Sequence, residues 1–269
     1  MNNYEKLEGM VAATFTPLDE NGDVNLSVID KYADWIASTP IKGVFVCGTT
    51  GEFSSLTIDE RKLILEKWLV SARKRFKVIA HVGSNCQRSA MELARHAAQV
   101  GADAIASIAP SFFKPGTVDE LVDFFAPICH SAAGLPFYYY NMPSITGVNL
   151  PVDKFLVEGK KKIPNLVGTK FTHNNLMEMG VCIELEQHRF EVLHGYDEIL
   201  ISGLAMGAVA GVGSTYNYIP NVYQAIFDSM KMNDLETARH NQIKSIRTVE
   251  VIIKYLSLIH ISEPTRRVV

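Results

Sequence analysis

The sequence has 269 residues, of which 47% are hydrophobic and 20% charged, and its formal net charge is −3. This balance is too apolar for a disordered chain and lacks the basic excess of a nucleic-acid-binding protein. The four cysteines lie far apart, and neither a signal-peptide pattern nor an apolar run of about 18 residues is present. We therefore expect a cytoplasmic α/β enzyme with no nucleic-acid partner and no membrane association.

Eight short apolar runs recur along the chain with the composition of buried strands. They are GMVAATFTP near residue 10, GVFVCGTTGE from Gly43, KVIAHVGS from Lys77, ADAIASIAP from Ala102, LPFYYYNMP from Leu135, NLVGTKFTH from Asn165, RFEVLHGYDE from Arg189 and GAVAGVGST from Gly207. Their mean spacing of about 28 residues fits a strand plus a crossover helix. Such nearly continuous apolar runs are typical of parallel strands that are covered on both faces.

Helical patterns lie between these runs. The segments that begin at Thr57, Ser89 and Thr117 each place a glutamate three residues after a hydroxyl side chain, which is the pattern of a capping box. Eight alternating strand and helix units predict a closed (β/α)8 barrel, also called a TIM barrel, over residues 1–233. A doubly wound open sheet has the same alternation and is the alternative fold.

The end of the chain differs from the rest. Residues 234–258 predict a short, truncated C-terminal extension of one or two helices packed on the barrel. Their apolar residues are Ile243, Ile246, Val249, Ile252 and Ile253. Residues 259–269 show no periodicity and resemble a vector-derived sequence, so we expect a non-native tail there.

The sixth run carries one lysine, Lys170, among apolar residues. The carboxyl ends of the strands in a parallel barrel converge on one mouth, where reacting groups gather. Because side chains alternate across a strand, Gly168, Lys170 and Thr172 share a face. If this face is the barrel interior, burial disfavours the ammonium ion and leaves an amine that can attack a carbonyl carbon. The alternative is a lysine that extends its charge into water.

Other polar residues follow the neighbouring runs. Tyr138 and Tyr140 share a face, and a phenol beside an imine-forming lysine could carry protons, although packing aromatics would look the same. Residues 47–52 combine two glycines, expected to turn backbone N–H groups toward one point, with two threonine hydroxyls, as a carboxylate cradle would. Residues 211–215 suit either a phosphate site or tight packing.

Acidic residues and histidines complete the set of candidates. Asp197 and Glu198 could accept hydrogen bonds from a polyol or begin the following helix. His81 and His194 end strands near the expected mouth, but no metal-ligand spacing accompanies them, so we expect no metal and no cofactor.

Five motifs together carry a family resemblance. GTTGE at 48–52, YNMPSITG at 140–147, GTKFTH at 168–173, GYDE at 195–198 and GSTYN at 213–217 resemble the superfamily of N-acetylneuraminate lyases and dihydrodipicolinate synthases, which are Schiff-base (class I) pyruvate aldolases. The resemblance runs from about Gly9 to about residue 256. It implies that Lys170 forms the imine, that Tyr140 relays a proton and that Thr49 and Thr50 hold the pyruvate carboxylate. It also implies a homotetramer.

The resemblance favours the lyase branch over the synthase branch. Synthase-type members carry an arginine at the position of Ile145 and a tyrosine relay where this chain reads SFFKP from Ser111. In the lyase pattern, Asp197 and Glu198 accept hydrogen bonds from the hydroxyl tail of a sugar. A polar wall around this tail would be completed by Thr172, Gly195 and Ser214.

The implied reaction is reversible cleavage of N-acetylneuraminate, a sialic acid, to N-acetylmannosamine and pyruvate. Three alternatives remain open. One is another class I pyruvate aldolase of the superfamily with a different 2-keto-acid substrate, and another is a non-catalytic protein that binds pyruvate or sialate. The third is a metal-dependent aldolase, which would lose activity with a chelator.

Overall fold

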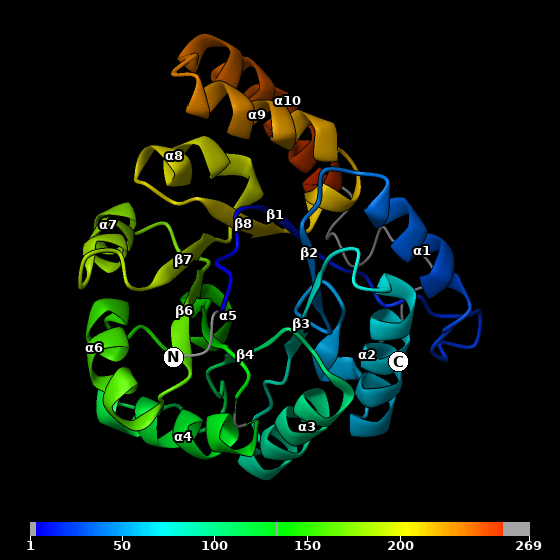
Figure 1. Ribbon diagram of the computed structural model, residues 1–269, viewed down its shortest axis with the longest axis vertical. Coiled ribbons are helices and arrows are strands. Elements are labelled where there is room, and N and C mark those ends of the chain that lie inside the picture. Colours follow the sequence, from blue (N-terminus) through cyan, green and yellow to red (C-terminus); the bar gives the residue numbers. More distant parts are fainter. Residues whose placement is uncertain (1–3, 133, 255–269) are drawn as a thin grey trace.

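Eight parallel strands close into one barrel in the computed structural model, which describes residues 4–132 and 134–254 (Figure 1). The strands are β1 (Gly9–Ala13), β2 (Gly43–Val46), β3 (Lys77–His81), β4 (Ala104–Ile108), β5 (Phe137–Asn141), β6 (Leu166–Phe171), β7 (Glu191–His194) and β8 (Ala210–Gly213). Each strand pairs with the next in chain order, and β8 pairs with β1. The (β/α)8 barrel is confirmed and the open sheet is wrong.

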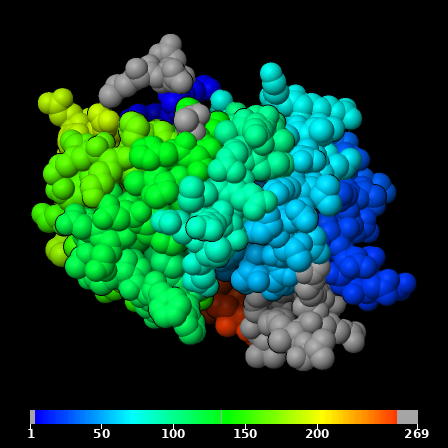
Figure 2. Space-filling view, turned by 90° about the horizontal axis from the view of Figure 1, so that it is seen from below, coloured from blue at the N-terminus to red at the C-terminus, as the bar shows by residue number. Residues whose placement is uncertain are grey.

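Helices lie around the strands, most of them in an outer ring (Figure 1). They are α1 (Val28–Ala37), α2 (Ile58–Ala72), α3 (Gln87–Val100), α4 (Val118–Ser131), α5 (Pro143–Thr146), α6 (Val152–Lys162), α7 (Leu176–Glu184), α8 (Leu200–Ala205), α9 (Pro220–Lys231) and α10 (Leu235–Lys254). Short 3-10 helices follow three strands as η1 (Phe53–Ser55), η2 (Asp197–Ile199) and η3 (Thr215–Asn217). Figure 2 shows the side on which α3 and α4 cover the barrel. Within the described ranges, every helix is too short or too polar to cross a bilayer.

The predicted helix starts are only partly correct. The capping box at Thr57 is confirmed, because its hydroxyl accepts from the N–H of Glu60 and the Glu60 carboxylate accepts from the N–H of Thr57. At Thr117 only the hydroxyl half of the box forms. The box at Ser89 is wrong, because α3 already begins at Gln87 and Ser89 lies inside its first turn.

The floor of the barrel interior is filled by a buried polar network. The hydroxyl of Tyr138 donates to the carboxylate of Glu191 and also contacts the hydroxyl of Tyr4. The other oxygen of Glu191 accepts from the backbone N–H of Leu7 at 2.8 Å. Burial raises the pKa of Glu191. These contacts tie the N-terminal segment across the amino-terminal end of the barrel.

Close approach between β6 and β7 depends on Gly168. Phe137 pairs with Leu166 and Tyr138 pairs with Gly168, so β6 carries one extra residue at this point, as in a β-bulge. A Cβ on Gly168 would lie 2.0 Å from the carbonyl oxygen of Glu191. Only glycine fits without moving a strand.

The C-terminal extension is α10, which packs against α9, the last helix of the barrel, and against α8 and η2 (Figure 1). The five apolar residues noted along α10 divide between its buried and exposed sides, since Ile252 is 8% exposed and Ile246 and Val249 are half-buried. Ile243 and Ile253 are 53% and 67% exposed, whereas Asn241, Gln242 and Ser245 are buried. Part of the predicted extension over 234–258 and the predicted tail over 259–269 lie outside the described residues.

We predict that Gly168→Ala destabilises the fold by about 2–3 kcal/mol, because the new methyl group overlaps the β7 backbone. Chemical unfolding monitored by circular dichroism measures the loss. Gly116→Ala is the matched control, since the nearest atom to its Cβ would be 3.6 Å away. Equal stability of the two variants would contradict this account.

Candidate active site

Lys170 points into the barrel interior at its carboxyl end. The residue is 4% exposed, and its Nζ lies 4.0 Å from the ring centroid of Tyr140 and 4.5 Å from that of Phe45. Within residues 4–132 and 134–254, no side chain or backbone group forms a hydrogen bond or ion pair with this amine. A lysine that extends its charge into water is therefore the wrong reading. The amine is held by strand register and by two ring faces, which attract a cation.

Tyr140 lies next to Lys170 because the two residues are partners in the ladder between β5 and β6. Its hydroxyl is 3.2 Å from the hydroxyl of Thr49 and donates to the sulfur of Met142 at 3.1 Å. Edge-to-face packing on Phe45, with centroids 5.6 Å apart, fixes the ring. A phenol, a hydroxyl and an amine from three different strand ends therefore meet at one mouth.

The loop that carries Thr49 and Thr50 turns for a different reason than expected. The residues in the left-handed region are Cys47 at φ 54° and Glu52 at φ 55°, not the two glycines. Gly48 provides space instead, because a Cβ there would lie 2.8 Å from the ring of Phe45. Thr49 and Thr50 are half-buried at the mouth, as a cradle requires.

A buried arginine that the sequence did not single out supports this loop. Arg61 from α2 is 4% exposed and donates to the carbonyl of His81 at 2.7 Å and to that of Gly83 at 2.9 Å. Nδ1 of His81 lies 2.8 Å from the carbonyl oxygen of Cys47. Burial and the nearby Arg61 charge hold the pKa of His81 well below its ordinary value, so the ring is neutral and Nδ1 carries the proton that it donates. These hydrogen bonds connect α2 through His81 to Cys47 and so fix the start of the loop that carries Thr49.

The opposite wall contains Thr172, Gly195 and Ser214. The hydroxyl of Thr172 is buried and has no hydrogen-bond partner among the described residues. Gly195 leaves room for this hydroxyl, since a Cβ there would lie 2.0 Å from Thr172 Oγ1. Ser214 is half-buried where β8 ends. An unpaired buried hydroxyl is costly, so this wall is suited to a ligand that supplies the missing bond.

Asp197 is the most strongly held acid at the mouth. Its Oδ2 accepts from the N–H of Thr215 at 2.8 Å and from the Thr215 hydroxyl at 2.6 Å. The carboxylate lies directly against Gly213, where a Cβ would be 1.8 Å from Oδ1. Burial raises the pKa of Asp197 to about 6, although the Thr215 bonds and the Lys170 charge act in the other direction. Glu198, the next residue, is half-buried.

Several other predicted residues do not join this group. Tyr138 shares the inward face with Tyr140 but lies at the barrel floor with Glu191. His194 packs outward against Gly203 of α8, and burial lowers its pKa to about 4. Gly211 makes room for the hydroxyl of Tyr216, which supports the packing interpretation of residues 211–215. No cluster of three or more His, Cys, Asp or Glu able to hold a metal occurs in the described part of the chain.

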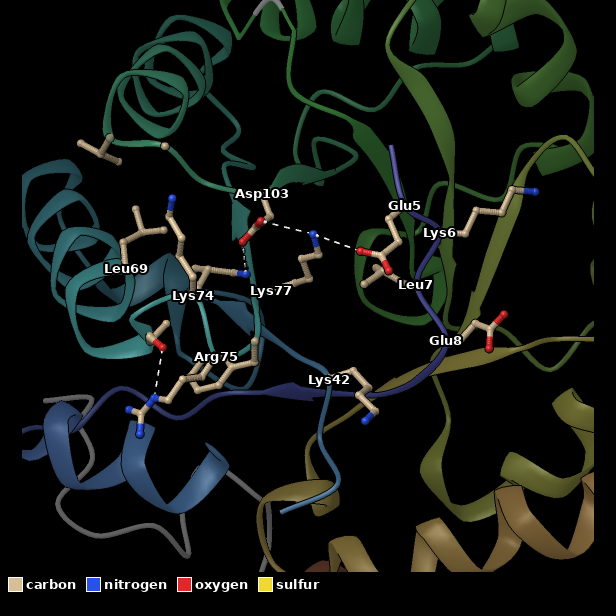
Figure 3. A pocket seen from close by; sticks show the side chains of 15 residues that line it. Glu5, Lys6, Leu7, Glu8, Lys42, Leu69, Lys74, Arg75, Lys77 and Asp103 are labelled. Carbon is tan, nitrogen blue, oxygen red and sulfur yellow. Dashed lines mark hydrogen bonds and ion pairs between the residues drawn. The ribbon is translucent and has the colours of Figure 1, made fainter. Parts of the chain in front are cut away.

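A separate cleft of about 1140 Å³ opens at the amino-terminal ends of the first strands (Figure 3). Lys77 lies there between Glu5 and Asp103, with Nζ 3.7 Å and 3.8 Å from their oxygens. None of the predicted site residues lines this cleft. The candidate active site is at the other end of the barrel.

The fold and the site define a class: a parallel (β/α)8 barrel with an inward lysine and an adjacent tyrosine at its carboxyl mouth. The chain belongs to the dihydrodipicolinate synthetase family, whose model matches residues 6–265. The resemblance inferred from the five motifs is thereby confirmed.

Individual relatives narrow the comparison. N-acetylneuraminate lyase of Mus musculus is 42% identical over 253 residues, which cover 93% of this chain and 79% of the relative. The solved structure of Proteus mirabilis N-acetylneuraminate lyase has a TM-score of 0.92 at 35% identity, covering 95% of this chain and 86% of that one. A catalytic lysine mutant of Ruminococcus gnavus sialic acid aldolase has a TM-score of 0.88 at 28% identity, covering 96% and 82%.

We predict a specific pH dependence of stability from Asp197. The carboxyl takes up its proton at about pH 6 in the folded protein and near 3.8 in the unfolded chain. Between these values the folded state binds more protons, so the free energy of unfolding falls as pH rises. The stability of the wild type relative to Asp197→Asn should therefore drop by about 2–3 kcal/mol between pH 4 and pH 6.5.

Unfolding curves of both proteins across this pH range measure the difference. His194, whose pKa is lowered, acts in the opposite sense but is present in both proteins and cancels. Parallel pH profiles would show that Asp197 titrates normally.

Proposed function

We propose that this protein is a class I aldolase that reversibly cleaves N-acetylneuraminate to N-acetylmannosamine and pyruvate. The observation that carries the proposal is the placement of Lys170 and Tyr140 as ladder partners, with the amine 4.0 Å from the phenol ring. The relatives named N-acetylneuraminate lyase, at 42% identity and a TM-score of 0.92, support the choice of substrate.

Lys170 is the proposed nucleophile. Its amine attacks the keto carbon of the open-chain sugar acid, and loss of water gives a protonated imine. The ring faces of Phe45 and Tyr140 stabilise the positive charge of this imine. The Ruminococcus gnavus sialic acid aldolase, which has the same fold, has been solved as a mutant of its catalytic lysine. The imine supplies the electron sink, so this route uses no metal or other cofactor.

Tyr140 is the proposed proton carrier for carbon–carbon cleavage. Expulsion of water during imine formation takes the phenol proton of Tyr140. When the bond beta to the imine carbon breaks, the resulting phenolate oxygen accepts the proton of the hydroxyl on the leaving carbon, which becomes the aldehyde of N-acetylmannosamine. The electrons of the broken bond form an enamine, which takes up a proton before the imine is hydrolysed to pyruvate. Thr49, 3.2 Å from the phenol oxygen, orients the hydroxyl for this transfer.

The Thr49 loop is the proposed carboxylate cradle. Thr49 and Thr50 provide two hydroxyls at the mouth, and Arg61 and His81 brace the loop from behind. Holding the carboxylate beside Tyr140 fixes the reacting carbons relative to both the amine and the phenol.

The opposite wall is the proposed site for the sugar tail. Oδ2 of Asp197 is occupied by Thr215, so Oδ1 and the carboxylate of Glu198 remain for sugar hydroxyls. The unpaired hydroxyl of Thr172 on this wall can bond the substrate, and Ser214, directly after β8, provides a second hydroxyl. Ile145, 61% exposed in α5, offers no charge for a second carboxylate, which disfavours the synthase reaction.

We further propose a cytoplasmic homotetramer. Phe112 and Phe113, 76% and 85% exposed on the loop after β4, are apolar side chains that a subunit interface would cover. The separated, unpaired cysteines fit a reducing compartment.

We predict that borohydride reduction in the presence of pyruvate adds a pyruvyl group to Lys170, detected by mass spectrometry of the intact protein and by peptide mapping. Lys170→Met keeps the side-chain volume but has no amine, so it should form no adduct and show no turnover. A folded wild-type protein without an adduct would exclude the imine route and favour a non-catalytic binding protein. An adduct without sialate cleavage would indicate another 2-keto-acid substrate.

We predict that Tyr140→Phe lowers kcat at least about 100-fold with little change in KM, because it removes the proton carrier and keeps the ring. The pyruvyl adduct should still form. Tyr139→Phe is the matched control: its ring faces α4 and α6, and its hydroxyl lies 3.4 Å from Asn141. Unchanged turnover in Tyr140→Phe would remove the assigned role.

A further inference from the structure

The buried face of α10 is polar where it meets the turn that carries Asp197 and Glu198. Gln242 is 4% exposed, and its neighbour Ser245 is fully buried. A helix that only covered the barrel would bury its isoleucines here, yet Ile243 points outward. Since a buried amide is costly unless its hydrogen bonds are made, the polar face must satisfy groups on the facing segment.

Both the nitrogen and the oxygen of the Gln242 side-chain amide form hydrogen bonds with the backbone of the facing segment, residues 197–201. Its Nε2 donates to the carbonyl of Asp197 at 3.0 Å and to Oγ of Ser245 at 2.7 Å. Its Oε1 accepts from the N–H of Ile201 at 2.8 Å. The orientation of the amide is fixed by chemistry, because a backbone carbonyl only accepts and a backbone N–H only donates.

The two backbone groups that Gln242 holds are separated by four residues. In a continuous α-helix the N–H of Ile201 would bond the carbonyl of Asp197 directly. Instead this carbonyl accepts from the N–H of Leu200, which is a 3-10 bond, and the N–H of Ile201 turns to Gln242. The amide of Gln242 therefore keeps η2 distinct from α8.

The same turn is held on its other side by η3 and α9. Thr215 binds Oδ2 of Asp197, and the hydroxyl of Thr215 contacts that of Tyr223 in α9. If η2 merged into α8, the backbone of Asp197 would rotate and its carboxylate would leave Thr215 and Gly213.

We infer that Gln242 of the C-terminal helix is a positioning residue that sets recognition of the sugar tail by holding the Asp197–Glu198 turn in its 3-10 geometry. The inference rests on the proposed function for its substrate. Gln242 acts on this wall alone, because Lys170 and the Thr49 loop are placed by strand register and by Arg61.

Gln242→Met in the full chain tests this role, since methionine keeps the length and helix preference but forms neither bond. Asn241→Leu is the matched control, because Asn241 is also buried and its amide donates to Thr237 within α10. Gln242→Glu is a second variant that keeps the acceptor for Ile201 and loses the donor to Asp197. Hydrogen exchange of the peptide that contains Ile201 should be faster in Gln242→Met than in the wild type and unchanged in Asn241→Leu.

Kinetics separate positioning from general stability. In Gln242→Met we expect KM for N-acetylneuraminate to rise about tenfold, with borohydride trapping of pyruvate on Lys170 at the wild-type rate. Gln242→Glu should raise KM in the same direction. Asn241→Leu should leave both readouts unchanged.

The outcomes are distinct. Wild-type KM and wild-type exchange in Gln242→Met would overturn the inference, as would an equal loss of pyruvate trapping, which indicates a merely structural role. Equal effects in Asn241→Leu would overturn it too. If the wild type itself forms no adduct, the proposed function fails, and the exchange measurement still decides whether Gln242 holds the turn.

Discussion

The amine of Lys170 is placed by backbone register, since none of its described neighbours hydrogen-bonds to it. Its position follows from the pairing of Tyr140 with Lys170 across β5 and β6. A slip of one residue would turn the lysine toward the outer helices and remove the amine from the mouth. The extra residue in β6 and the contact at Gly168 fix that register. The chemistry at the top of the barrel therefore depends on a steric requirement near its floor.

The two walls of the mouth are supported by unlike means. On the Thr49 side, Arg61 of α2 satisfies two carbonyls and the neutral His81 of β3 satisfies a third, so the support comes from elements early in the chain. On the Asp197 side, the support comes from η3, α9 and α10. Because the two supports share no residue, we expect substitutions behind one wall to leave the geometry of the other wall unchanged.

Much of the fold could be predicted because the patterns that indicate it lie within short stretches of sequence. Parallel strands covered on both faces show as continuous apolar runs, and alternation along the sixth run places Gly168 and Lys170 on one face. The motifs likewise bring Thr49, Tyr140 and Asp197 to strand ends. The support of the site could not be predicted in this way. Arg61 lies in a helix with ordinary amphipathic spacing, and the apolar residues of α10 do not indicate that Gln242 and Ser245 are buried as well. Which face a helix buries depends on the backbone groups opposite, and those are known only in three dimensions.

Buried polar groups at the mouth that lack a protein partner lower the stability of the fold. Oγ1 of Thr172 and Nε2 of His81 have no hydrogen-bond partner among the described residues, and each such group costs about 1–3 kcal/mol of folding free energy. A barrel built only for stability would replace them with apolar side chains, as it does over most of its interior. A ligand that bonds Thr172 recovers part of this cost on binding. The site therefore has a higher affinity for a ligand with a polar group at that point. The same trade applies to Asp197, whose burial raises its pKa and disfavours its charge until hydroxyl donors approach it. Under the proposed function, this wall would favour a polyol over an apolar aldehyde, because only the polyol offers hydroxyl donors that offset the desolvation of the carboxylate.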